Sequence, residues 1–196
     1  MAEYDCRANL IAAAIPMFAA KGLNGVSVRD IAREAGVNLS MISYYFGGKE
    51  GLYAAVLIDQ FSILREVESL DLMEVNPLLK FEIYVRAIVA RYRANPYLLR
   101  FYTSELTTPT PSFDVIVKPA IRRVIDTLLA VFSEGISHNM FRDGLDPVDS
   151  VLSLAGMINF YFLLEPVTKE LIDHSQNRDE ELIRHIMDIF GRGVLK

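Results

Sequence analysis

The chain has 196 residues, 52% of them hydrophobic, and a formal net charge of −5 at pH 7. This apolar content supplies a sizeable core and excludes a globally disordered chain. The acidic excess lies beyond residue 50, because residues 1–50 carry equal numbers of basic and acidic side chains. The acidic total argues weakly against a nucleic-acid partner, but a neutral segment can bind DNA when its few cations gather on one face.

Cysteine content and apolar segments indicate the compartment. The single cysteine, Cys6, excludes an intrachain disulfide and fits a reducing cytosol. The N-terminus begins with acidic residues and lacks the plan of a signal peptide. The most apolar segment, SVLSLAGMINFYFLLE at residues 150–165, is too short and too broken to span a bilayer. We therefore expect a cytoplasmic protein with no membrane partner.

The N-terminal segment predicts three short helices. Helical periodicity covers residues 5–21, where Pro16 is expected to kink or split the helix. A second helix is predicted to start at Ser27, in a segment that resembles a capping box, and to end at Gly36 in a left-handed conformation. Asn38 is placed to cap a third helix of about two turns.

The rest of the chain predicts a larger helical body. Two glycines, Gly47 and Gly48, separate it from the first three helices, and Asn-Pro and Asp-Pro pairs mark later helix starts. The predicted helices cover residues 49–68, 78–94, 96–106, 112–140, 147–164 and 179–193. We therefore predict an all-α protein of about nine helices, with a helix-turn-helix domain in residues 1–50 and an effector-binding and dimerisation domain in residues 51–196.

The stretch from Val26 to Tyr53 has the order of a helix-turn-helix, whose second helix enters the major groove of DNA. Its second helix is rich in hydroxyl, amide and tyrosine side chains that can meet base edges, and the helix starts before and after it can bind phosphates. An ordinary helical hairpin packed inside a bundle fits the pattern equally well. The predicted DNA-contacting residues are Ser27, Val28, Arg29, Asn38, Leu39, Ser40, Met41, Ser43, Tyr44, Tyr45 and Lys49.

The same segment resembles a known family. LIAAAIPMFAAKG followed by SVRDIAREAGVNLSMISYYFGGKEGLY is similar, over about residues 7–57, to the N-terminal domain of TetR/AcrR-type transcriptional regulators, and YYFGGKEGLY is similar to the CecR-like branch. RFYTSELTTPTP and DGLDPVDSVLSLAGMINFYFLLEPV agree more loosely with that branch. The resemblance implies an all-α homodimer that represses transcription until a small molecule binds the body. Ser43 stands where many members have tyrosine, which places the phosphate-contacting tyrosine at Tyr44, and Pro16 interrupts a helix that is normally continuous.

The helix predicted over residues 147–164 is apolar nearly all round, so it is expected to lie between the body's own core and a second subunit. Together with the last helix it predicts a four-helix dimer interface, as the resemblance also implies. A dimer places two reading heads about one DNA turn apart, so that they read a palindrome. The predicted interface residues are Leu152, Ala155, Ile158, Phe162, Leu182, Ile186, Ile189 and Phe190.

Aromatic and soft side chains on the body helices are candidates for an effector pocket, although each is more often plain core. The candidates are Tyr84, Tyr92, Phe101, Tyr102, Glu105, Met157 and Tyr161. Glu105 could pair with a cationic ligand, or it could be a solvated or capping carboxylate. His138, His174 and His185 lack metal-ligand spacing with Cys6, so no metal or other cofactor is predicted.

Two other functions remain open from the sequence. An all-α enzyme has no support, because no nucleophile–base order, phosphate-cradling glycine loop or paired carboxylates occur. A helical adaptor that binds another protein through the last two predicted helices is the third possibility. Phosphate contacts make affinity fall steeply with salt, whereas docking on an apolar face does not, so salt dependence separates the adaptor from the DNA reader.

Overall fold

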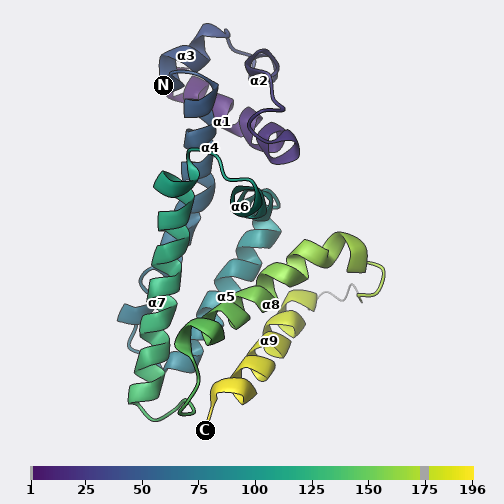
Figure 1. Cartoon of the computed structure of the whole chain (residues 1–196). Coiled ribbons are helices and arrows are strands. Elements are labelled where there is room, and N and C mark those ends of the chain that lie inside the picture. The colour runs from purple at the N-terminus through teal and green to yellow at the C-terminus, as the bar shows by residue number, and fades with distance from the viewer. Residues whose placement is uncertain (1, 173–176) are drawn as a thin grey trace. The chain divides into compact units, whose positions relative to one another are not determined.

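The computed structural model describes residues 2–172 and 177–196. Across these residues the chain forms nine α-helices, and the only strand-like pairing is one bridge between Phe141 and Leu195 (Figure 1). The all-α prediction is therefore confirmed. The helices are α1 Ala2–Lys21, α2 Val28–Glu34, α3 Ser40–Phe46, α4 Lys49–Ser62, α5 Pro77–Ala94, α6 Leu98–Thr107, α7 Lys118–Ser137, α8 Pro147–Thr168 and α9 Arg178–Val194, with short turns η1 Ile63–Val67, η2 Leu70–Leu72 and η3 Phe113–Val117.

Two predicted helices differ from the sequence prediction near a proline. The α1 helix runs through Pro16, so of the predicted kink or split the split is wrong. The helix predicted over residues 112–140 is divided, because residues 113–117 form the π-helical turn η3 and α7 begins only at Lys118. Pro119 therefore lies in the first turn of α7, where its missing N–H costs no intrahelical hydrogen bond.

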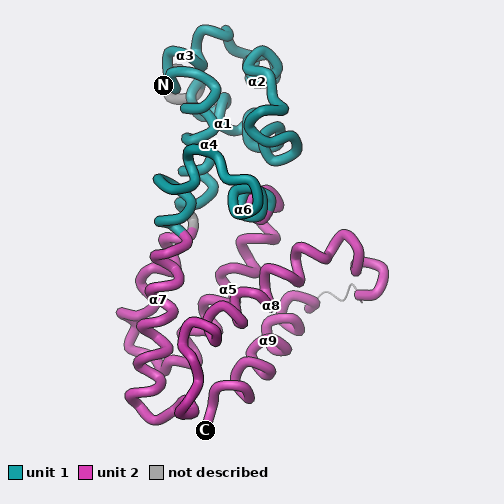
Figure 2. The backbone as a smooth tube through the Cα atoms, viewed as in Figure 1, with its two compact units in different colours: residues 1–63, 100–120 teal, residues 64–99, 121–196 magenta. Residues whose placement is uncertain are grey.

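The chain divides into two compact units, which Figure 2 colours separately. Unit 1 comprises residues 1–63 and 100–120, and unit 2 comprises residues 64–99 and 121–196. The functional boundary predicted between residues 50 and 51 falls inside α4, and it stays a prediction. Residues 100–120 belong with the N-terminal helices, a grouping that chain order alone does not reveal.

The core of unit 1 lies between α1 and α4. Leu10, Ala14 and Phe18 are the buried face of α1, and the Phe18 ring meets the buried Tyr53 ring edge-on at a centroid distance of 5.0 Å. The α2 and α3 helices add Ile31 and other buried side chains to this core. The three N-terminal helices α1, α2 and α3, which we call the head, therefore pack on α4. The α4 helix supplies buried surface that three short helices alone lack.

The core of unit 2 centres on phenylalanine rings. Phe141 lies 5.1 Å from Phe132 and 6.1 Å from Phe81, and Phe190 lies 5.1 Å from Phe81. All four rings are buried, and they come from α5, α7, the α7–α8 loop and α9. The loop ring enters because Gly135 has no side chain: a Cβ there would lie 2.1 Å from the Phe141 ring.

The α8 helix differs from its sequence prediction in length. It has 22 residues and continues to Thr168, so by length and composition it could cross a membrane, and the expectation that it is too short is corrected. Only 22% of its apolar window is buried within the chain. Val151, Leu154, Ile158 and Phe162 form the buried side, packed with α5 and α9. Met157 and Tyr161 are partly buried against this core, whereas several other apolar side chains are exposed: Val148, Leu152, Phe160, Leu163 and Val167.

We expect Gly135→Ala to lower the free energy of unfolding by about 1–3 kcal/mol, because its methyl group overpacks against a fully enclosed ring. The urea midpoint of the purified chain measures this loss. Gly193→Ala is the matched control: it is another helical glycine of unit 2, and a Cβ there meets nothing within 4 Å. The control should be neutral or more stable by up to about 1 kcal/mol. Equal midpoints for the two variants would contradict the packing argument.

Candidate DNA-binding surface

Only the Ser27 side of the capping box predicted at the start of α2 is present in the structure. Ser27 has extended backbone angles, and its hydroxyl oxygen accepts a hydrogen bond from the Arg29 N–H at 3.2 Å. Asp30 does not complete the expected capping box, because its carboxylate binds the Arg33 guanidinium at 2.5 Å. Ser27 and Arg29 are exposed, so this helix start can receive a phosphate oxygen.

The turn between α2 and α3 has the predicted left-handed glycine. Gly36 has φ +67°, and the next N–H, of Val37, donates to the Ala32 carbonyl at 3.0 Å. The Asn38 side-chain oxygen then accepts from both the N–H and the hydroxyl of Ser40, each at 2.9 Å. The α3 helix begins at Ser40 with Leu39 in the N-cap position, so the predicted cap at Asn38 lies one residue too early. The Asn38 oxygen is nevertheless engaged by the first residue of α3.

In the α3 helix one side chain is buried and the others are exposed or half-buried. Ile42 is 2% exposed and anchors the helix in the core, whereas Tyr44 is 68% exposed and Leu39 is 41% exposed. The Tyr44 and Tyr45 rings meet edge-on at 4.9 Å. The outer face of α3 thus presents hydroxyl, aromatic and apolar groups together, which is the mixture that reads base edges and thymine methyl groups.

Two contacts fix the end of α3, and sequence reasoning missed both. The Arg7 guanidinium of α1 lies over the Phe46 ring, 5.4 Å from its centroid. A Cβ at Gly51 would lie 1.8 Å from the Phe46 carbonyl oxygen, so only glycine lets α4 approach α3 this closely. The sequence FGGKEG contained a signal for the second contact. Gly51 lies near the start of a helix, where glycine lowers helix stability, so its presence there indicates a close approach that a larger residue would block.

Lys49, predicted to bind phosphate, has a second role. Its ammonium group donates to the Val26 carbonyl at 3.4 Å, which ties the first turn of α4 to the residue before the α2 cap. The side chain is half-buried. An ammonium group has three donors, so one bond to a carbonyl leaves donors for a phosphate oxygen. Lys49 can therefore brace the head and bind DNA.

All the predicted DNA-contacting residues lie in unit 1. They are exposed or half-buried, with Val28, Met41, Tyr45 and Lys49 in the second group. The structure brings the start of α2, the exposed face of α3 and the start of α4 into one compact unit. Their roles as DNA contacts stay predictions.

The predicted effector residues are divided between the units. Phe101, Tyr102 and Glu105 lie in unit 1, and the others, Tyr84, Tyr92, Met157 and Tyr161, lie in unit 2. The Tyr92 hydroxyl donates to Asn159 at 2.6 Å, and the Tyr161 oxygen accepts from Arg178 at 3.3 Å. Burial raises the pKa of Tyr102. Within each unit these side chains act as core or as bonded pairs.

Glu105 is neither solvated nor paired with a cation among the described residues. It is fully buried and accepts hydrogen bonds from the Tyr53 hydroxyl and from the N–H of Thr110. Of the interpretations made from sequence, the solvated carboxylate is wrong. The bond to the Thr110 N–H is made to the loop after α6 and not to a helix start.

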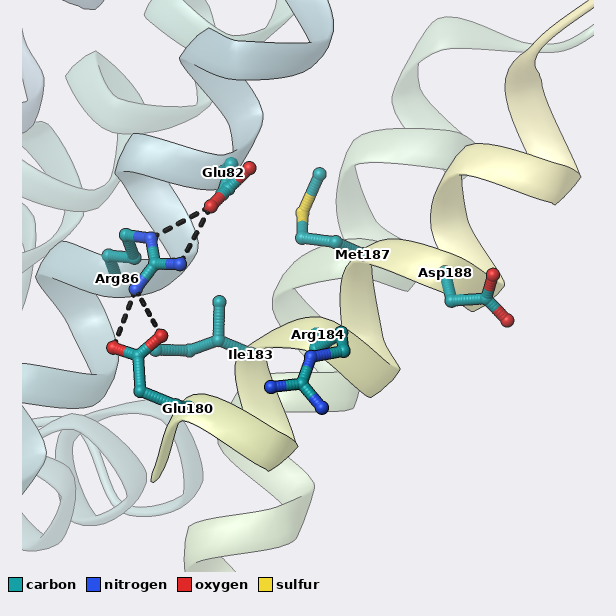
Figure 3. A pocket seen from close by; sticks show the side chains of 7 residues that line it. All are labelled: Glu82, Arg86, Glu180, Ile183, Arg184, Met187 and Asp188. Atoms are coloured by element: carbon teal, nitrogen blue, oxygen red, sulfur yellow. Dashed lines mark hydrogen bonds and ion pairs between the residues drawn. The ribbon is translucent and has the colours of Figure 1, made fainter. Parts of the chain in front are cut away.

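One open groove in unit 2 was not predicted. It encloses about 480 Å³ between α5 and α9 and is lined by Glu82, Arg86, Glu180, Ile183, Arg184, Met187 and Asp188 (Figure 3). Arg86 binds Glu82 at 2.8 Å and both carboxylate oxygens of Glu180 at 2.6 and 2.7 Å. Glu82 and Arg86 are one helical turn apart, a spacing that could have revealed the pair. The charged lining differs from the aromatic pocket expected.

The predicted dimer residues are mostly inside the subunit. Ile158, Phe162, Leu182, Ile186 and Phe190 are buried in the core of unit 2. Leu152 and Ile189 are about half exposed, at 49% and 48%, and Ala155 is intermediate. The periodicity identified apolar positions correctly but did not divide them between the chain's own core and a second subunit.

Metal-ligating side chains do not cluster in the described chain: no three His, Cys, Asp or Glu residues there could hold one ion. Cys6 is half-buried and forms no disulfide. His174 lies outside the described residues.

Comparison with known proteins finds relatives of the N-terminal segment. The model for bacterial regulatory proteins of the tetR family matches residues 10–56, which hold most of α1, all of α2 and α3, and half of α4. Over these residues the chain is similar to the tetR family. The regulator CecR of Shigella flexneri is 49% identical over 51 residues, which are 26% of this chain and 22% of CecR. These matches agree with the resemblance drawn from the sequence.

Longer matches, at lower identity, extend over the body of the chain. The regulator RutR of Escherichia coli strain K12 is 22% identical over 187 residues, covering 95% of this chain and 87% of RutR. The ketosteroid transcriptional regulator KstR2 of Mycobacterium tuberculosis has the same fold, with a TM-score of 0.78, 20% identity, and coverage of 97% of this chain and 95% of KstR2. Both of these similar proteins are named as transcriptional regulators.

We expect Lys49→Met to weaken DNA binding to a similar extent for all sequences, because the lost contact is to phosphate. The slope of log affinity against log salt should become shallower by about one. Arg29→Met, at the exposed start of α2, is the matched cation control and should change the slope similarly. An unchanged slope for Lys49→Met, with a lower melting temperature, would restrict Lys49 to its bond with Val26.

Proposed function

We propose that this chain is a sequence-specific DNA-binding transcriptional regulator of the tetR family. The observation that carries the proposal is α3: a short helix anchored by Ile42, with the polar and aromatic residues Ser40, Ser43 and Tyr44 exposed, in the segment that matches the family model. Residues 1–50 form the DNA-binding domain in this proposal, and residues 51–196 the effector-binding and dimerisation domain. It acts in the cytoplasm, where its DNA lies.

In the proposed complex, α3 enters the major groove and its exposed face reads base edges. Ser27, Arg29 and Lys49 lie at the starts of α2 and α4, where N–H groups and cations favour phosphate. These contacts set the register, and α3 supplies the sequence preference. Tyr44 is the most exposed large side chain of α3, and its phenol can bind either a base edge or a phosphate.

The proposed regulator is a homodimer, and α8 supplies its interface. One side of α8 is packed in the core, yet apolar side chains also cover its outer side. The outward residues, to which α9 adds Ile189, are Val148, Leu152, Phe160, Leu163 and Val167. A second copy that covers this face would bury apolar surface worth about 25 cal/mol per Å². The same pairing presents two α3 helices to a palindromic operator.

Repression is the regulatory direction that we propose. The chain occupies an operator until a small molecule binds the body and favours a conformation with lower DNA affinity. Effector and DNA then oppose each other through one coupling free energy, of order 1–3 kcal/mol. KstR2 is named as a ketosteroid regulator, and that chemistry is KstR2's own.

Selection from a random DNA library tests the proposal directly. We expect the purified chain to enrich an inverted repeat, and the Tyr44→Ala variant to lose that enrichment while keeping its melting temperature, because Tyr44 is 68% exposed. Binding strength should fall steeply with salt. Leu72→Ala, at a similarly exposed residue of unit 2, is the control and should retain full enrichment. Enrichment by neither protein at low salt would favour a protein-binding adaptor.

Leu163→Glu should convert the dimer to a monomer, because it places a charge in the proposed apolar contact. The residue is 48% exposed in the subunit, so the fold should tolerate the change. Sedimentation equilibrium measures the mass. Leu72→Glu, at 80% exposure on η2, is the matched control and should remain dimeric. If Leu163→Glu remains dimeric with unchanged affinity, the interface does not include this face of α8.

A further inference from the structure

Glu105 of α6 is the one fully buried acidic side chain in the described chain. The Tyr53 hydroxyl donates to its Oε1 atom at 2.7 Å. The Thr110 N–H donates to Oε2 at 3.2 Å, and the Thr110 hydroxyl lies 3.0 and 3.1 Å from the two oxygens. No Lys, Arg or His among the described residues forms an ion pair with it. The carboxyl group is therefore held by neutral donors alone.

The buried carboxyl group of Glu105 depends on all three of these hydrogen-bond donors. A buried carboxylate without a cation is costly, and removing any one donor leaves an acceptor unsatisfied in a dry site. Burial, and then the hydrogen bond and charge of Glu105, raise the pKa of Tyr53, so its hydroxyl keeps its proton and stays a donor near neutral pH. Either the whole network is formed, or the carboxyl group must move.

The donors come from two separated parts of the chain. Tyr53 lies one turn into α4, where its ring contacts Phe18 and lies 6.2 Å from the Phe101 ring. Thr110 lies in the loop after α6, and its hydroxyl oxygen and carbonyl accept from the N–H groups of Ser112 and Phe113 at the start of η3. The η3 turn in turn packs on α4.

The network thus explains why residues 100–120 fall in unit 1 although α5 separates them in sequence from the first helices (Figure 2). The α4 helix follows α3 after only Gly47 and Gly48, and it is held against the Phe46 carbonyl at Gly51. A shift of α4 is therefore transmitted to the end of α3.

We propose that Glu105 is a positioning residue for DNA binding, whose carboxyl group locks residues 100–120 onto α4 and thereby fixes how α3 is presented. The DNA-reading unit of this chain is then discontinuous: it consists of the N-terminal helices and a second segment that arrives after α5. This inference rests on the proposed function, and it adds a residue far from the reading helix in sequence.

The test uses full-length Tyr53→Phe, Glu105→Gln and the double variant. The operator is the sequence selected by the natural protein, and affinity is measured well below every melting temperature. Each single change should weaken operator binding about tenfold, as expected for the loss of one buried hydrogen bond. The double variant should be no more than about twofold weaker than either single one, because both changes disrupt the same buried network.

Lys80→Met is the matched control for lost stability. Lys80 is buried in unit 2 and binds Glu134 at 2.6 Å and the Asp71 carbonyl at 3.0 Å. The change should lower the melting temperature and leave operator affinity within about twofold. If Tyr53→Phe and Glu105→Gln also lose only stability, Glu105 is a fold-stabilising group and the proposal is overturned.

Amide hydrogen exchange tests, without any DNA, whether Glu105 holds residues 107–117 against α4. In Tyr53→Phe we expect faster exchange in both residues 49–62 and residues 107–117, and in Lys80→Met in neither. Faster exchange in one segment alone would show that Glu105 does not lock them together. If the natural protein binds no DNA, the proposed function and the positioning role fail, and the exchange result still decides the lock. If Glu105→Gln does not fold, Thr110→Val, which keeps the backbone donor, replaces it.

Discussion

A helix of seven residues does not persist in water, so α3, the proposed reading helix, exists only because other parts of the chain hold it. Asn38 supplies its first turn with a side-chain acceptor, and Ile42 fixes it to the core. Its last turn is held by the Arg7 cation over Phe46 and by the close approach that Gly51 permits. The exposed face can carry almost any sequence, because none of these contacts uses it.

The residues that hold α3 and the residues on its exposed face should differ in their effect on stability. The proposed reading residues Ser40, Ser43 and Tyr44 are exposed, whereas Ile42 holds α3 from its buried side. Asn38 and Arg7 hold its two ends. Substitutions on the face should therefore change specificity at constant stability, whereas substitutions at its supports should change both. The Glu105 network extends the set of supports to a second segment of the chain, through the helix on which the head is built.

The sequence predicted the head well because its signals are local. The helix cap at Ser27 and the left-handed turn at Gly36 depend on neighbours within a few residues, and both were found in the structure. The N-cap position of α3 is Leu39 rather than the predicted Asn38, although the Asn38 side chain accepts from the Ser40 N–H. The pairing of Glu105 with Tyr53 was not predictable, because the two lie 52 positions apart and no periodicity encodes it. The split of residues 112–140 into η3 and α7 was missed for a related reason, since contact with α4 overrides local helix propensity there.

The α8 helix shows a different limit of sequence reasoning. Because α8 is apolar nearly all round, its composition predicts that every side is buried. The periodicity of such a helix does not show which side packs in the chain's own core and which side contacts a partner. The buried residues Ile158 and Phe162 and the exposed residues Phe160 and Leu163 are equally apolar, and only the packing of α5 and α9 separates them. The side left uncovered is therefore a property of the fold, and it is this side, not the whole helix, that a second subunit has to match.

The distribution of charge adds a constraint on how such a dimer approaches DNA. The acidic excess lies entirely beyond residue 50, whereas the first 50 residues are neutral and carry Arg29 and Lys49 at helix starts. Phosphates repel the acidic body at distances up to a Debye length, about 8 Å at physiological salt, so encounters through the body are disfavoured. In the proposed complex the neutral N-terminal segment has only a few cations to contact phosphates, so the selectivity comes from the contacts that α3 makes in register. That selectivity would depend on how the short helix α3 is held.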